Sequence, residues 1–464
     1  MRARLLGAGL MVLAAGLAPV AAIAKTPAKV SAKVSAKGQP VLLISIDGLR
    51  PADVLEAQQR GLRIPNLRRF LAEGSYASGV TGVLPTLTYP SHTTLITGET
   101  PARHGVVSNT TFDPTAINQD GWYWYASDIR VPTLWDKARA GGKTTGNVHW
   151  PVSVGAKITW NLPQIWRTGH ADDAKLLGAL ASDGLLPELE HDEGAYAPGK
   201  DEDIASDENR GRFAARLIAR HRPDFLTVYL TGLDHTQHLE GPDSAPAHEV
   251  LERLDAVVGK LVIAELKARP DAVVALVSDH GFAPVTEMLN PSRALLDAGL
   301  IRLSPPDPLG RVSIAGWDAA VWASGGSFAV RLAQDDNAVR GKVRDILAQI
   351  AADPANHIDR ILERADIARM GGNPDADFYV NLGAGMMASG WLGAQVPLRV
   401  PSHYKGMHGY FPDDPRMRST FMMMGKGVAR GHDLGQIDMR TIAPTLESRL
   451  LGRPVKGAPG NIAP

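Results

Sequence analysis

Three short hydrophobic runs in the body of the chain share one pattern. They are VLLISI (41–46), FLTVYL (225–230) and AVVALV (272–277). Each is rich in β-branched or aromatic residues and does not alternate between apolar and polar positions, which is typical of strands buried on both faces of a parallel sheet. Apolar residues recur at helical spacing over roughly 53–74, 209–221 and 247–268. The pattern predicts an α/β fold with a largely parallel central sheet flanked by helices.

Acidic residues follow each of the three predicted strands. Asp47 comes directly after the first, Asp234 follows the second after a Thr-Gly-Leu segment, and Asp279-His280 closes the third. A single Asp after a strand is more often a turn or capping residue than a ligand. Open α/β sheets, however, place their sites just beyond the carboxyl ends of strands, so three such ends predict one shared site. The chain must turn at Asp279-His280 for both to reach it, and Gly281 permits a turn.

The residue types at these positions favour a metal site. Asp234 and His238 in LDHTQHLEGP are four residues apart, so one helical turn would place a carboxylate and an imidazole on the same side. His408 lies before a glycine in KGMHGYFPDD and is a weaker candidate when taken alone. Because the chain has no cysteine, a metal ion would have to be bound by His, Asp or Glu.

A hydroxyl group stands out in the stretch LTYPSHTTLITG (87–98). Pro90 suits the first turn of a helix and Gly98 suits a helix end, so Thr88 is predicted at or just before a helix N-terminus. The free amides and the positive dipole end there favour an anion. For an isolated T-x-P, an N-cap role is the simpler interpretation. A hydroxyl becomes a nucleophile when its pKa is lowered, which a metal ion can do without a neighbouring base.

The N-terminus has the features of an export signal. Two arginines precede a long apolar stretch that ends in the small-residue sequence AIA at 22–24. We therefore expect a signal peptide over 1–24 and a mature protein exported to the periplasm or the extracellular space, with an uncleaved membrane anchor as the alternative. Residues 25–39 contain an AKVS repeat and are expected to be a solvated basic linker ahead of the folded domain, 40–464.

Composition excludes several classes of function. The chain has 464 residues, of which 44% are hydrophobic and 21% charged, as in ordinary globular proteins. Its formal net charge is zero, so it carries no nucleic-acid-binding signature. No later stretch has the ~18 uninterrupted apolar residues of a membrane span, so no membrane anchor is expected after signal cleavage. Nothing in the sequence indicates an oligomeric state.

Six motifs, in this order, resemble those of nucleotide pyrophosphatase/phosphodiesterases (type I phosphodiesterases) of the alkaline phosphatase superfamily. With the residues that they carry, they are SIDGLR (Asp47), LTYPSHTTLITG (Thr88), HGVVSN (Asn109), LDHTQHLEGP (Asp234, His238), SDHGF (Asp279, His280) and MHGY (His408). The resemblance runs from about residue 41 to 450. It implies that 40–464 is an alkaline-phosphatase-like catalytic domain with a cap insertion at roughly 112–222 and a second insertion at roughly 283–400. We assign the second insertion no role beyond helping to close the site.

The resemblance also implies two zinc ions per chain, side by side. One would be bound by Asp47, Asp279, His280 and the Thr88 oxygen, and the other by Asp234, His238 and His408. Thr88 would attack phosphorus in line and form a covalent intermediate, which water would then hydrolyse. Asn109 and the backbone N–H of Tyr89 would bind a non-bridging phosphate oxygen. The implied function is hydrolysis of phosphodiester or pyrophosphate bonds, with a small phosphate diester or a nucleotide as substrate.

Aromatic residues are expected to contribute to substrate choice. Tyr89 follows the nucleophile, where the family usually carries an aromatic residue against the substrate, and Trp160 and Trp166 lie in a tryptophan-rich segment. Aromatic faces stack on bases with roughly 1–3 kcal/mol each, although most of these tryptophans would simply fill the core of the cap. Monoesterase relatives carry a paired lysine and arginine in the cap, and between Trp150 and Arg167 the only basic residues are Lys157 and Arg167, not obviously paired, which favours a diester.

Two alternatives remain open from the sequence. One is another activity in the same superfamily: a phosphomonoesterase, a phosphonate hydrolase or a phospholipid head-group phosphodiesterase. The other, from a different class, is a metal-binding or carrier protein without turnover, which would not need Thr88.

Overall fold

The computed structural model describes residues 38–117, 121–166, 172–197, 202–393 and 395–455. The expected signal peptide (1–24) and the expected linker (25–39), apart from its last two residues, lie outside these ranges. Within them, we find no helix that has both the length and the apolar content needed for a membrane crossing.

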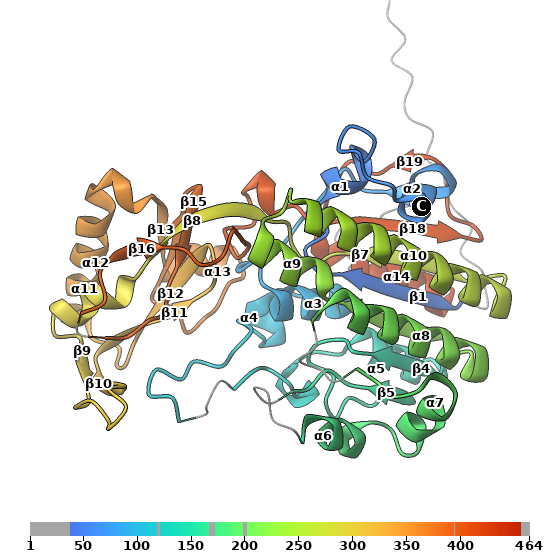
Figure 1. The fold of residues 1–464 in the computed structure, drawn as a ribbon, viewed down its shortest axis with the longest axis horizontal. Coiled ribbons are helices and arrows are strands. Elements are labelled where there is room, and N and C mark those ends of the chain that lie inside the picture. The colour runs from blue at the N-terminus through green and yellow to red at the C-terminus, as the bar shows by residue number, and fades with distance from the viewer. Residues whose placement is uncertain (1–37, 118–120, 167–171, 198–201, 394, 456–464) are drawn as a thin grey trace, which may run out of the picture. The chain divides into compact units, whose positions relative to one another are not determined.

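A central eight-stranded sheet organises the part of the domain that carries the candidate site (Figure 1). In spatial order its strands are β19 (His432–Asp433), β2 (Gly74–Tyr76), β18 (Phe421–Gly425), β7 (Val273–Val277), β1 (Val41–Ile46), β6 (Phe225–Leu230), β4 (Thr145–Val148) and β5 (Trp160–Leu162). β1 pairs in parallel with β6 and β7, whereas β18 runs antiparallel to β7 and β2. The largely parallel α/β sheet predicted from the hydrophobic runs is confirmed, and these runs are its three neighbouring central strands.

Helices cover both faces of the sheet, so every residue of the three central strands β1, β6 and β7 is buried. In β1, Leu42 and Ile44 point into one core, which they share with α2, α8 and α10, while Val41 and Leu43 point into another, which they share with α3, α5 and α14. The bounds of these helices are α2 (Pro65–Glu73), α3 (Thr88–Thr97), α5 (Leu134–Ala140), α8 (Ile204–His221), α10 (Ala245–Ala268) and α14 (Ile442–Leu451). Continuous apolar runs, without alternation, are what a sheet buried on both sides requires.

The predicted helices need correction at their ends. The segment 53–74 forms two helices, α1 (Pro51–Leu55) and α2, because Gly61 adopts a positive φ between them and Pro65 starts the second. Helices α8 and α10 begin earlier than expected. The side chains of Asp203 and Ser244 accept hydrogen bonds from backbone N–H groups three residues on and so fix these starts.

The segment 112–222, expected as a cap insertion, is in part a component of the core. Its strand β4 pairs with β6, its strand β5 pairs with β4, and α8 packs on one face of the sheet. The sequence of β4 is TGNV, which is fully buried but has no apolar run, so the hydrophobic pattern does not reveal it. The segment also contains α6 (Asp173–Leu180) and α7 (Leu185–Glu193).

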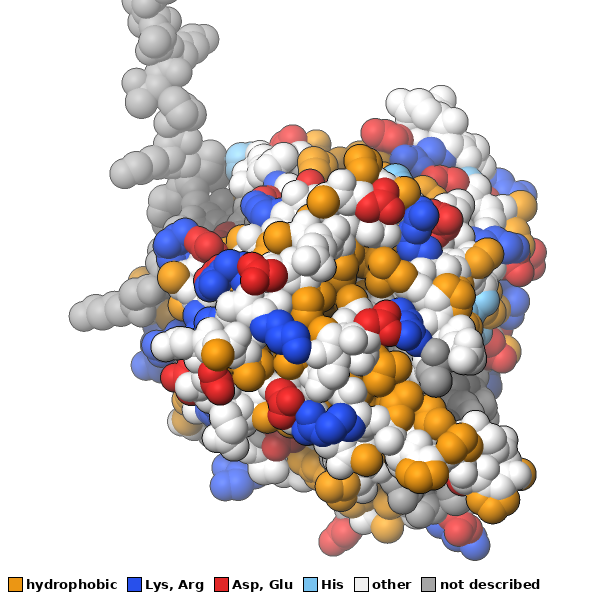
Figure 2. Space-filling view, turned by 90° about the vertical axis from the view of Figure 1, so that its left-hand side faces the viewer, with side chains coloured by type: hydrophobic (Ala, Val, Ile, Leu, Met, Phe, Trp, Pro, Cys, Tyr) orange, Lys and Arg blue, Asp and Glu red, His pale blue; other side chains and the backbone are white. Residues whose placement is uncertain are grey.

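The segment 283–400, which we call the insertion lobe, has sheets and a core of its own. An antiparallel sheet has the order β11-β12-β14-β13, and a second has the order β15-β8-β16. The bounds are β8 (Ala283–Leu289), α11 (Pro291–Asp297), β9 (Ile301–Leu303), β10 (Ile314–Trp317), β11 (Ala319–Ala323), β12 (Ser327–Leu332), α12 (Asn337–Ala352), β13 (Ile358–Glu363), α13 (Arg364–Arg369), β14 (Phe378–Leu382), β15 (Gly385–Ala388) and β16 (Arg399–Pro401). Figure 2, which views the domain from this side, shows basic side chains beside acidic ones, in keeping with the zero net charge.

Four further short elements lie in the described chain. They are β3 (Gly79–Thr81), which pairs with β20 (Gln436–Asp438), the helix α4 (Pro101–His104), and β17 (Gly406–Met407), which pairs with β8. Strand β17 immediately precedes His408, so the pairing with β8 fixes where that histidine enters the site.

Candidate metal centre

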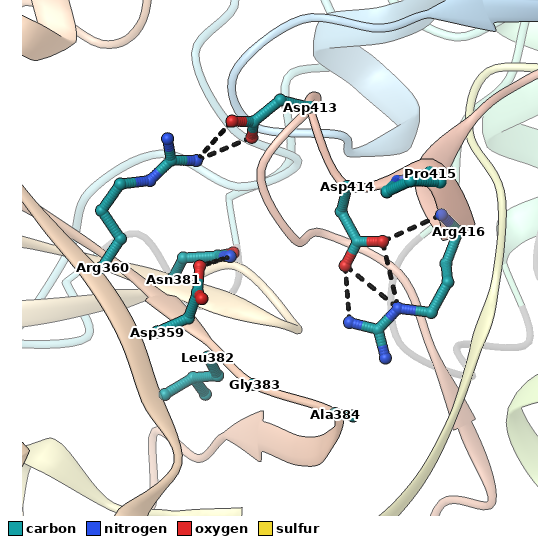
Figure 3. Close-up of a pocket in the computed structure, with 10 residues that line it drawn as sticks. All are labelled: Asp359, Arg360, Asn381, Leu382, Gly383, Ala384, Asp413, Asp414, Pro415 and Arg416. Atoms are coloured by element: carbon teal, nitrogen blue, oxygen red, sulfur yellow. Dashed lines mark hydrogen bonds and ion pairs between the residues drawn. The ribbon is translucent and has the colours of Figure 1, made fainter. Parts of the chain in front are cut away.

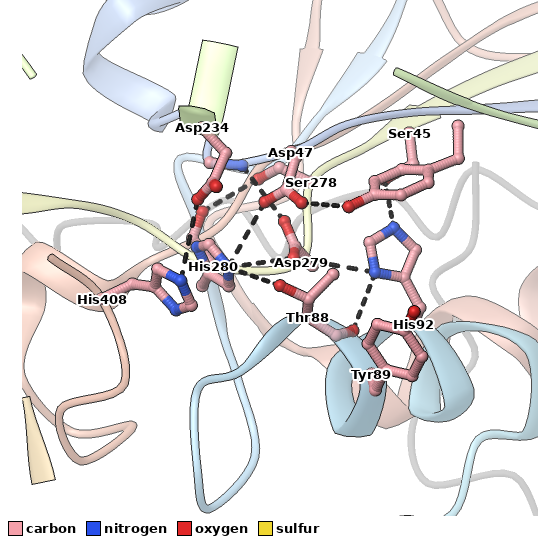
Figure 4. A network of polar contacts seen from close by, with 12 residues as sticks. Ser45, Asp47, Thr88, Tyr89, His92, Asp234, Ser278, Asp279, His280 and His408 are labelled. Carbon is pink, nitrogen blue, oxygen red and sulfur yellow. Dashed lines mark hydrogen bonds and ion pairs between the residues drawn. The ribbon is translucent and has the colours of Figure 1, made fainter. Parts of the chain in front are cut away.

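The carboxyl ends of β1, β6 and β7 meet at one edge of the sheet. Ile46 at the end of β1 is in register with Leu230 at the end of β6, and Ser45 is in register with Val277 of β7. Asp47 follows β1 directly, Asp234 lies in the first turn of α9 (Gly232–Glu240) after β6, and Asp279 and His280 follow β7. Figure 4 shows these side chains converging with Thr88 and His408.

A first group of candidate ligands consists of Asp47, Asp279 and His280. One ligand atom from each lies within 4.8 Å of the others. The His280 Nε2 is 3.0 Å from Asp279 Oδ2 and 3.4 Å from Asp47 Oδ1. The Thr88 hydroxyl is 3.5 Å from the same Nε2. The four residues predicted for one metal ion are therefore neighbours in the structure.

A second group consists of Asp234, His238 and His408, and it lies directly beside the first. The Nε2 atoms of His238 and His408 are 3.3 Å and 3.7 Å from the Asp234 carboxylate. Asp234, His280 and His408 also satisfy the 4.8 Å criterion together, so His280 lies between the groups. Its ring stacks on that of His408 with 3.6 Å between centroids. The second predicted set is thus also brought together.

The three imidazoles are oriented as metal ligands by backbone carbonyl groups. The Nδ1 atoms of His238, His280 and His408 lie 3.0, 3.1 and 3.1 Å from the carbonyl oxygens of Gly406, Gly281 and Thr86. Because a carbonyl oxygen only accepts, each Nδ1 carries the proton and donates it. The Nε2 atoms, which face the carboxylates, are then left with a free lone pair. This second set of contacts is how proteins usually fix the tautomer of a ligating histidine.

Three buried carboxylate oxygens have no hydrogen-bond partner among the described residues. They are Asp47 Oδ1, Asp234 Oδ1 and Asp279 Oδ2, one from each strand end. Burial, followed by the charges of Asp234 and Asp279, raises the pKa of Asp47. Buried carboxylates with unsatisfied oxygens are stable as a cluster when a cation binds them. The donors are oxygen and nitrogen atoms, three or four to each group, which fits two divalent metal ions.

The charges of the histidines agree with this role. Burial, and then the neighbouring His280, lowers the pKa of His408 to about 3, so its imidazole is neutral, as a ligand must be. Burial opposes ionisation of Asp234, but the neighbouring His238 outweighs it and lowers the pKa of Asp234 to about 2. Asp234 is therefore an anion at any pH at which the protein is expected to work.

Three residues that the sequence analysis did not single out hold the first group in place. The Tyr229 hydroxyl donates to Asp47 Oδ2. His92 lies with its Nδ1 2.8 Å from the Thr88 carbonyl oxygen and its Nε2 2.9 Å from the Ser45 hydroxyl. His92 lies four residues after Thr88 in the predicted helix, so its position one turn along the same face was available as a signal. Tyr229 faces Asp47 only through the pairing of β6 with β1, so its role depends on the fold.

Thr88 is the first residue of α3, as predicted, but it is not an N-cap. The cap position is Leu87, and no side chain caps this helix. Thr88 is 8% exposed. Its side chain lies against His280 and not against the free amides of α3, so the simpler N-cap interpretation does not fit.

Asn109 and Tyr89 lie together next to Thr88. The backbone N–H of Tyr89 donates to Asn109 Oδ1 at 3.0 Å. The Nδ2 of Asn109 has no hydrogen-bond partner among the described residues. The two groups expected to bind a phosphate oxygen are therefore adjacent, with the Tyr89 amide engaged by Asn109 in this structure.

The predicted aromatic residues have different positions. Tyr89 is 1% exposed, because its hydroxyl donates to Gln164 and its ring packs 5.2 Å from Trp122. Trp166 packs on Trp122 and Trp124, so these four rings form one cluster beside the nucleophile. Within it Tyr89 is a buried support, and Trp122 and Trp166 are only partly buried.

Trp160 does not lie at the site. It is in register with Gly146 at the start of β4, at the amino ends of the parallel strands. Its ring stacks on His221 at the end of α8, 4.7 Å between centroids. The carboxylates are at the opposite edge of the sheet, so the prediction that Trp160 binds substrate is not supported by its position. Arg167, one of the two basic residues considered for the cap, lies outside the described residues.

One hollow in the described structure lies away from this site. A cavity of about 510 Å³ separates β13 and β14 from the loop after His408 (Figure 3). Two ion pairs line it, Arg360 with Asp413 and Arg416 with Asp414, and Asp359 accepts a hydrogen bond from Asn381. Because no candidate ligand lines it, the metal centre and not this cavity is the candidate active site.

The sequence matches the type I phosphodiesterase/nucleotide pyrophosphatase family over residues 41–410. The chain belongs to this family. The match covers most of the chain and includes Thr88, Asn109 and all the candidate ligands described above. Two adjacent candidate metal sites are consistent with a family of bimetallic enzymes.

Curated members of the family align with about half of the chain. Human ectonucleotide pyrophosphatase/phosphodiesterase family member 1 is 28% identical over 254 residues, which are 52% of this chain and 23% of that protein. Bovine bis(5'-adenosyl)-triphosphatase ENPP4 is 27% identical over 251 residues, 53% of this chain and 48% of that protein. An uncharacterised pyrophosphatase/phosphodiesterase of Schizosaccharomyces pombe is 28% identical over 255 residues, 53% and 45% of the two chains. The matches thus span less than half the length of these relatives.

Solved structures of the family share the fold. Human ENPP5 superposes with a TM-score of 0.64 at 19% identity and covers 91% of this chain and 97% of its own. An inactive murine ENPP5 in complex with AMP gives the same values. At this level of identity the likeness establishes the architecture, and the chemistry has to be argued from the residues of this chain.

Proposed function

We propose that the protein is an exported two-zinc hydrolase that cleaves phosphodiester or pyrophosphate bonds of nucleotides through a covalent intermediate on Thr88. One observation carries this proposal. A threonine hydroxyl that caps no helix lies against two adjacent carboxylate–histidine groups with unsatisfied oxygens. Export is supported by the signal-like sequence of residues 1–24.

Zinc is the metal that the donors favour, and the residues of the chain divide between two sites. Asp47, Asp279, His280 and Thr88 would bind one ion, and Asp234, His238 and His408 the other. Bound zinc would lower the pKa of the Thr88 hydroxyl and stabilise negative charge on the reacting oxygens. Such O/N sites accept several divalent ions, so the donor set favours zinc without requiring it.

Thr88 would attack the phosphorus of the substrate with Oγ1. A new Thr88 oxygen–phosphorus bond forms while the bond from phosphorus to the leaving oxygen breaks, and water then hydrolyses the threonine ester and regenerates the hydroxyl. His92 holds the carbonyl group of Thr88, and through Ser45 it connects the start of α3 to β1. The hydroxyl is therefore placed by a rigid element, which is what positioning for in-line attack requires.

Asn109 would bind a non-bridging phosphate oxygen. Its Oδ1 is held by the Tyr89 amide, so its Nδ2 can donate to the phosphate without losing a bond within the protein. When substrate binds, the Tyr89 amide would be a second donor only if it released Asn109. We therefore assign the first contact to Asn109.

The aromatic cluster would bind the base of a nucleotide. Trp122 and Trp166 are the partly buried members, and the buried ring of Tyr89 packs against Trp122. Base stacking on such a surface contributes about 1–3 kcal/mol for each base. The cluster begins at the residue after the nucleophile, so a nucleotide whose 5'-phosphorus faces Thr88 would place its base there.

The charges at the site favour a diester. Among the described residues, no lysine or arginine forms an ion pair with Asp47, Asp234 or Asp279. An additional carboxylate, Glu202, lies 3.6 Å from the ring of His235, the residue after Asp234. A monoester dianion would meet the negative charge of Glu202 without a basic partner for its second charge among the described residues, whereas a diester carries only one negative charge.

The decisive experiment compares a diester with a monoester on zinc-loaded protein that begins at Lys25. We expect kcat/KM for bis-p-nitrophenyl phosphate to exceed that for p-nitrophenyl phosphate. A ratio well below one would mean that the protein is a monoesterase of the same superfamily. The absence of turnover with either ester, in protein shown to contain two zinc ions, would contradict the proposal.

Variants of α3 test the nucleophile. Thr88→Ala should lower kcat by about 10³-fold or more, because loss of a covalent nucleophile removes a pathway and not only a contact. Thr88→Ser keeps a hydroxyl and should retain measurable turnover. Thr97→Ala is the matched control: this threonine is buried in the same helix and its hydroxyl bonds the Thr93 carbonyl, far from the ligands.

A further inference from the structure

Residues 406–411, which we call the His408 segment, shape the second group of ligands. His408 itself belongs to that group. The carbonyl oxygen of Gly406 accepts a hydrogen bond from Nδ1 of His238 at 3.0 Å, so the segment also orients the second imidazole. The carboxylates of the first group, in contrast, follow strands β1 and β7 of the central sheet. The two groups of ligands therefore depend on different parts of the chain.

The insertion lobe binds every residue of the His408 segment. Gly406 and Met407 form β17, which pairs with β8. Further hydrogen bonds each join one residue of the lobe to one residue of the segment. They are the Gly326 N–H to the His408 carbonyl (2.7 Å), the Ser327 hydroxyl to the Gly409 carbonyl, the Tyr410 hydroxyl to the Met386 carbonyl (2.8 Å) and the Phe411 N–H to Asn381 Oδ1 (2.8 Å). The lobe thus holds the backbone before and after His408.

The turn between β11 and β12 packs directly against the His408 segment. A Cβ added at Gly326 would lie 2.3 Å from the Tyr410 ring, and one at Gly409 would lie 1.9 Å from the Ser324 carbonyl oxygen. The hydroxyl of Ser327 lies within this contact, and Ser327 is 0% exposed. Because close-packed groups transmit displacements to each other, a shift of the turn would move the backbone of the segment.

The His408 segment is also joined to the chain that leads into Thr88. The Thr86 hydroxyl donates to the Tyr410 carbonyl at 2.7 Å, and the Thr86 carbonyl accepts from Nδ1 of His408. Thr86 is buried and stands two residues before the nucleophile proposed above. The placement of the lobe therefore also fixes where a ligand of the second group lies relative to Thr88.

We propose that the insertion lobe positions the second metal ion, and that Ser327 and Tyr410 are positioning residues that act through the backbone around His408. Neither residue is among the candidate ligands. The inference rests on the two-metal site of the proposed function. A ligand that is already oriented loses less conformational freedom when the ion binds. Loosening the lobe should therefore weaken the binding of one zinc ion and leave the other in place, because the carboxylates of the first group are held by the central sheet.

The test removes the two hydroxyl groups that join the lobe to the segment. Ser327→Ala/Tyr410→Phe changes no charge and no candidate ligand. The dissociation constants of both zinc ions are measured in protein that begins at Lys25, by competition with a chromophoric chelator. We expect one dissociation constant to rise by about 10- to 100-fold, the usual effect of losing a contact that orients a ligating histidine, and the other to stay unchanged. Turnover of bis-p-nitrophenyl phosphate should fall at limiting zinc and recover in excess zinc.

Ser324→Ala is the matched control. It removes a buried hydroxyl of the same turn whose partner, at 2.9 Å, is Tyr379 inside the lobe, so both dissociation constants should stay unchanged. Each single variant, Ser327→Ala or Tyr410→Phe, should show part of the shift. Thermal denaturation shows whether the double variant is folded, and the single variants carry the test if it is not.

Two results would overturn the role of the lobe. One is unchanged binding of both ions in folded variants, and the other is equal weakening of both ions, which general destabilisation produces. If the unmodified protein binds two zinc ions but cleaves no ester, the proposed function fails while the zinc affinities still decide the role of the lobe. Fewer than two ions bound by the unmodified protein would overturn both.

Discussion

Replacing the buried Glu265 by glutamine should stabilise the protein at neutral and alkaline pH. Glu265 lies in α10, is 2% exposed, and has an Oε2 with no hydrogen-bond partner among the described residues. Burial raises the pKa of its carboxyl group from the usual 4.5 to about 7, although Arg269 acts in the opposite direction. The folded protein therefore holds a proton that the unfolded chain releases at lower pH.

The sign and size of the effect follow from this difference. Between pH 4.5 and about 7 the folded state binds more protons than the unfolded state, so the free energy of unfolding falls as pH rises. Each pH unit contributes up to about 1.4 kcal/mol, so the full loss is about 3 kcal/mol. Glutamine does not ionise and has no such loss. The stability of Glu265→Gln relative to the unmodified protein should therefore increase by about 3 kcal/mol between pH 4.5 and 8.

Urea denaturation followed by tryptophan fluorescence at several pH values measures this quantity directly. Both proteins have the same metal ligands, so any pH dependence of metal binding cancels in the difference. Glu249→Gln, at an exposed position of the same helix, is the control and should show a nearly constant difference. If the curves for Glu265→Gln and the unmodified protein ran parallel from pH 4.5 to 8, the carboxyl group would not be shifted and the reasoning would be refuted.

Three further predictions concern the site and its support. His238→Ala should lower the zinc content from two ions per chain to one, and metal analysis that still found two would remove this residue from the ligand set. Trp122→Ala should raise KM for nucleotide substrates about fivefold or more, whereas Trp160→Ala should leave KM unchanged; the opposite result in steady-state kinetics would reverse our placement of the base. Gly281→Ala should lower the melting temperature markedly, because an added Cβ would lie 2.0 Å from the Arg416 carbonyl oxygen, and an unchanged melting temperature would show that this contact relaxes freely.

The sequence predicts the centre of the fold well because that part depends on local patterns. Strands buried on both faces produce unbroken apolar runs, so β1, β6 and β7 could be recognised without a structure. Parallel neighbours in such a sheet share one carboxyl edge, so the residues that follow them could be assigned to one site. Asp47 and Asp279 are therefore predictable from the chain alone.

Other features depend on contacts between segments that are far apart in the sequence, so no local sequence pattern predicts them. The strand β4 has the sequence TGNV, and its pairing with β6 is what places it in the core. Tyr229 reaches Asp47 through strand pairing. Trp160 and Trp166 are only six residues apart, but β5 runs along the sheet between them and leaves them at different ends. Aromatic composition could suggest a base-binding surface but not which rings form it.

Glycine is required at position 281, but for a different reason from the one that the sequence suggested. The sequence suggested that glycine permits a turn after Asp279 and His280, yet the φ angle of Gly281 is not positive. The structure instead shows that the carbonyl oxygens of Arg416 and Arg418 approach so closely that no Cβ fits. The position of His280 thus depends on a segment more than 130 residues away.

The stereochemical course at phosphorus tests the central claim, that Thr88 forms a covalent intermediate, most directly. A chiral phosphorothioate diester would be hydrolysed in isotopically labelled water by the zinc-loaded protein, and the configuration of the product determined. Attack by Thr88 followed by attack by water inverts the phosphorus twice, so we predict net retention. Net inversion would mean that water attacks the substrate in a single displacement, and it would contradict the role assigned to Thr88.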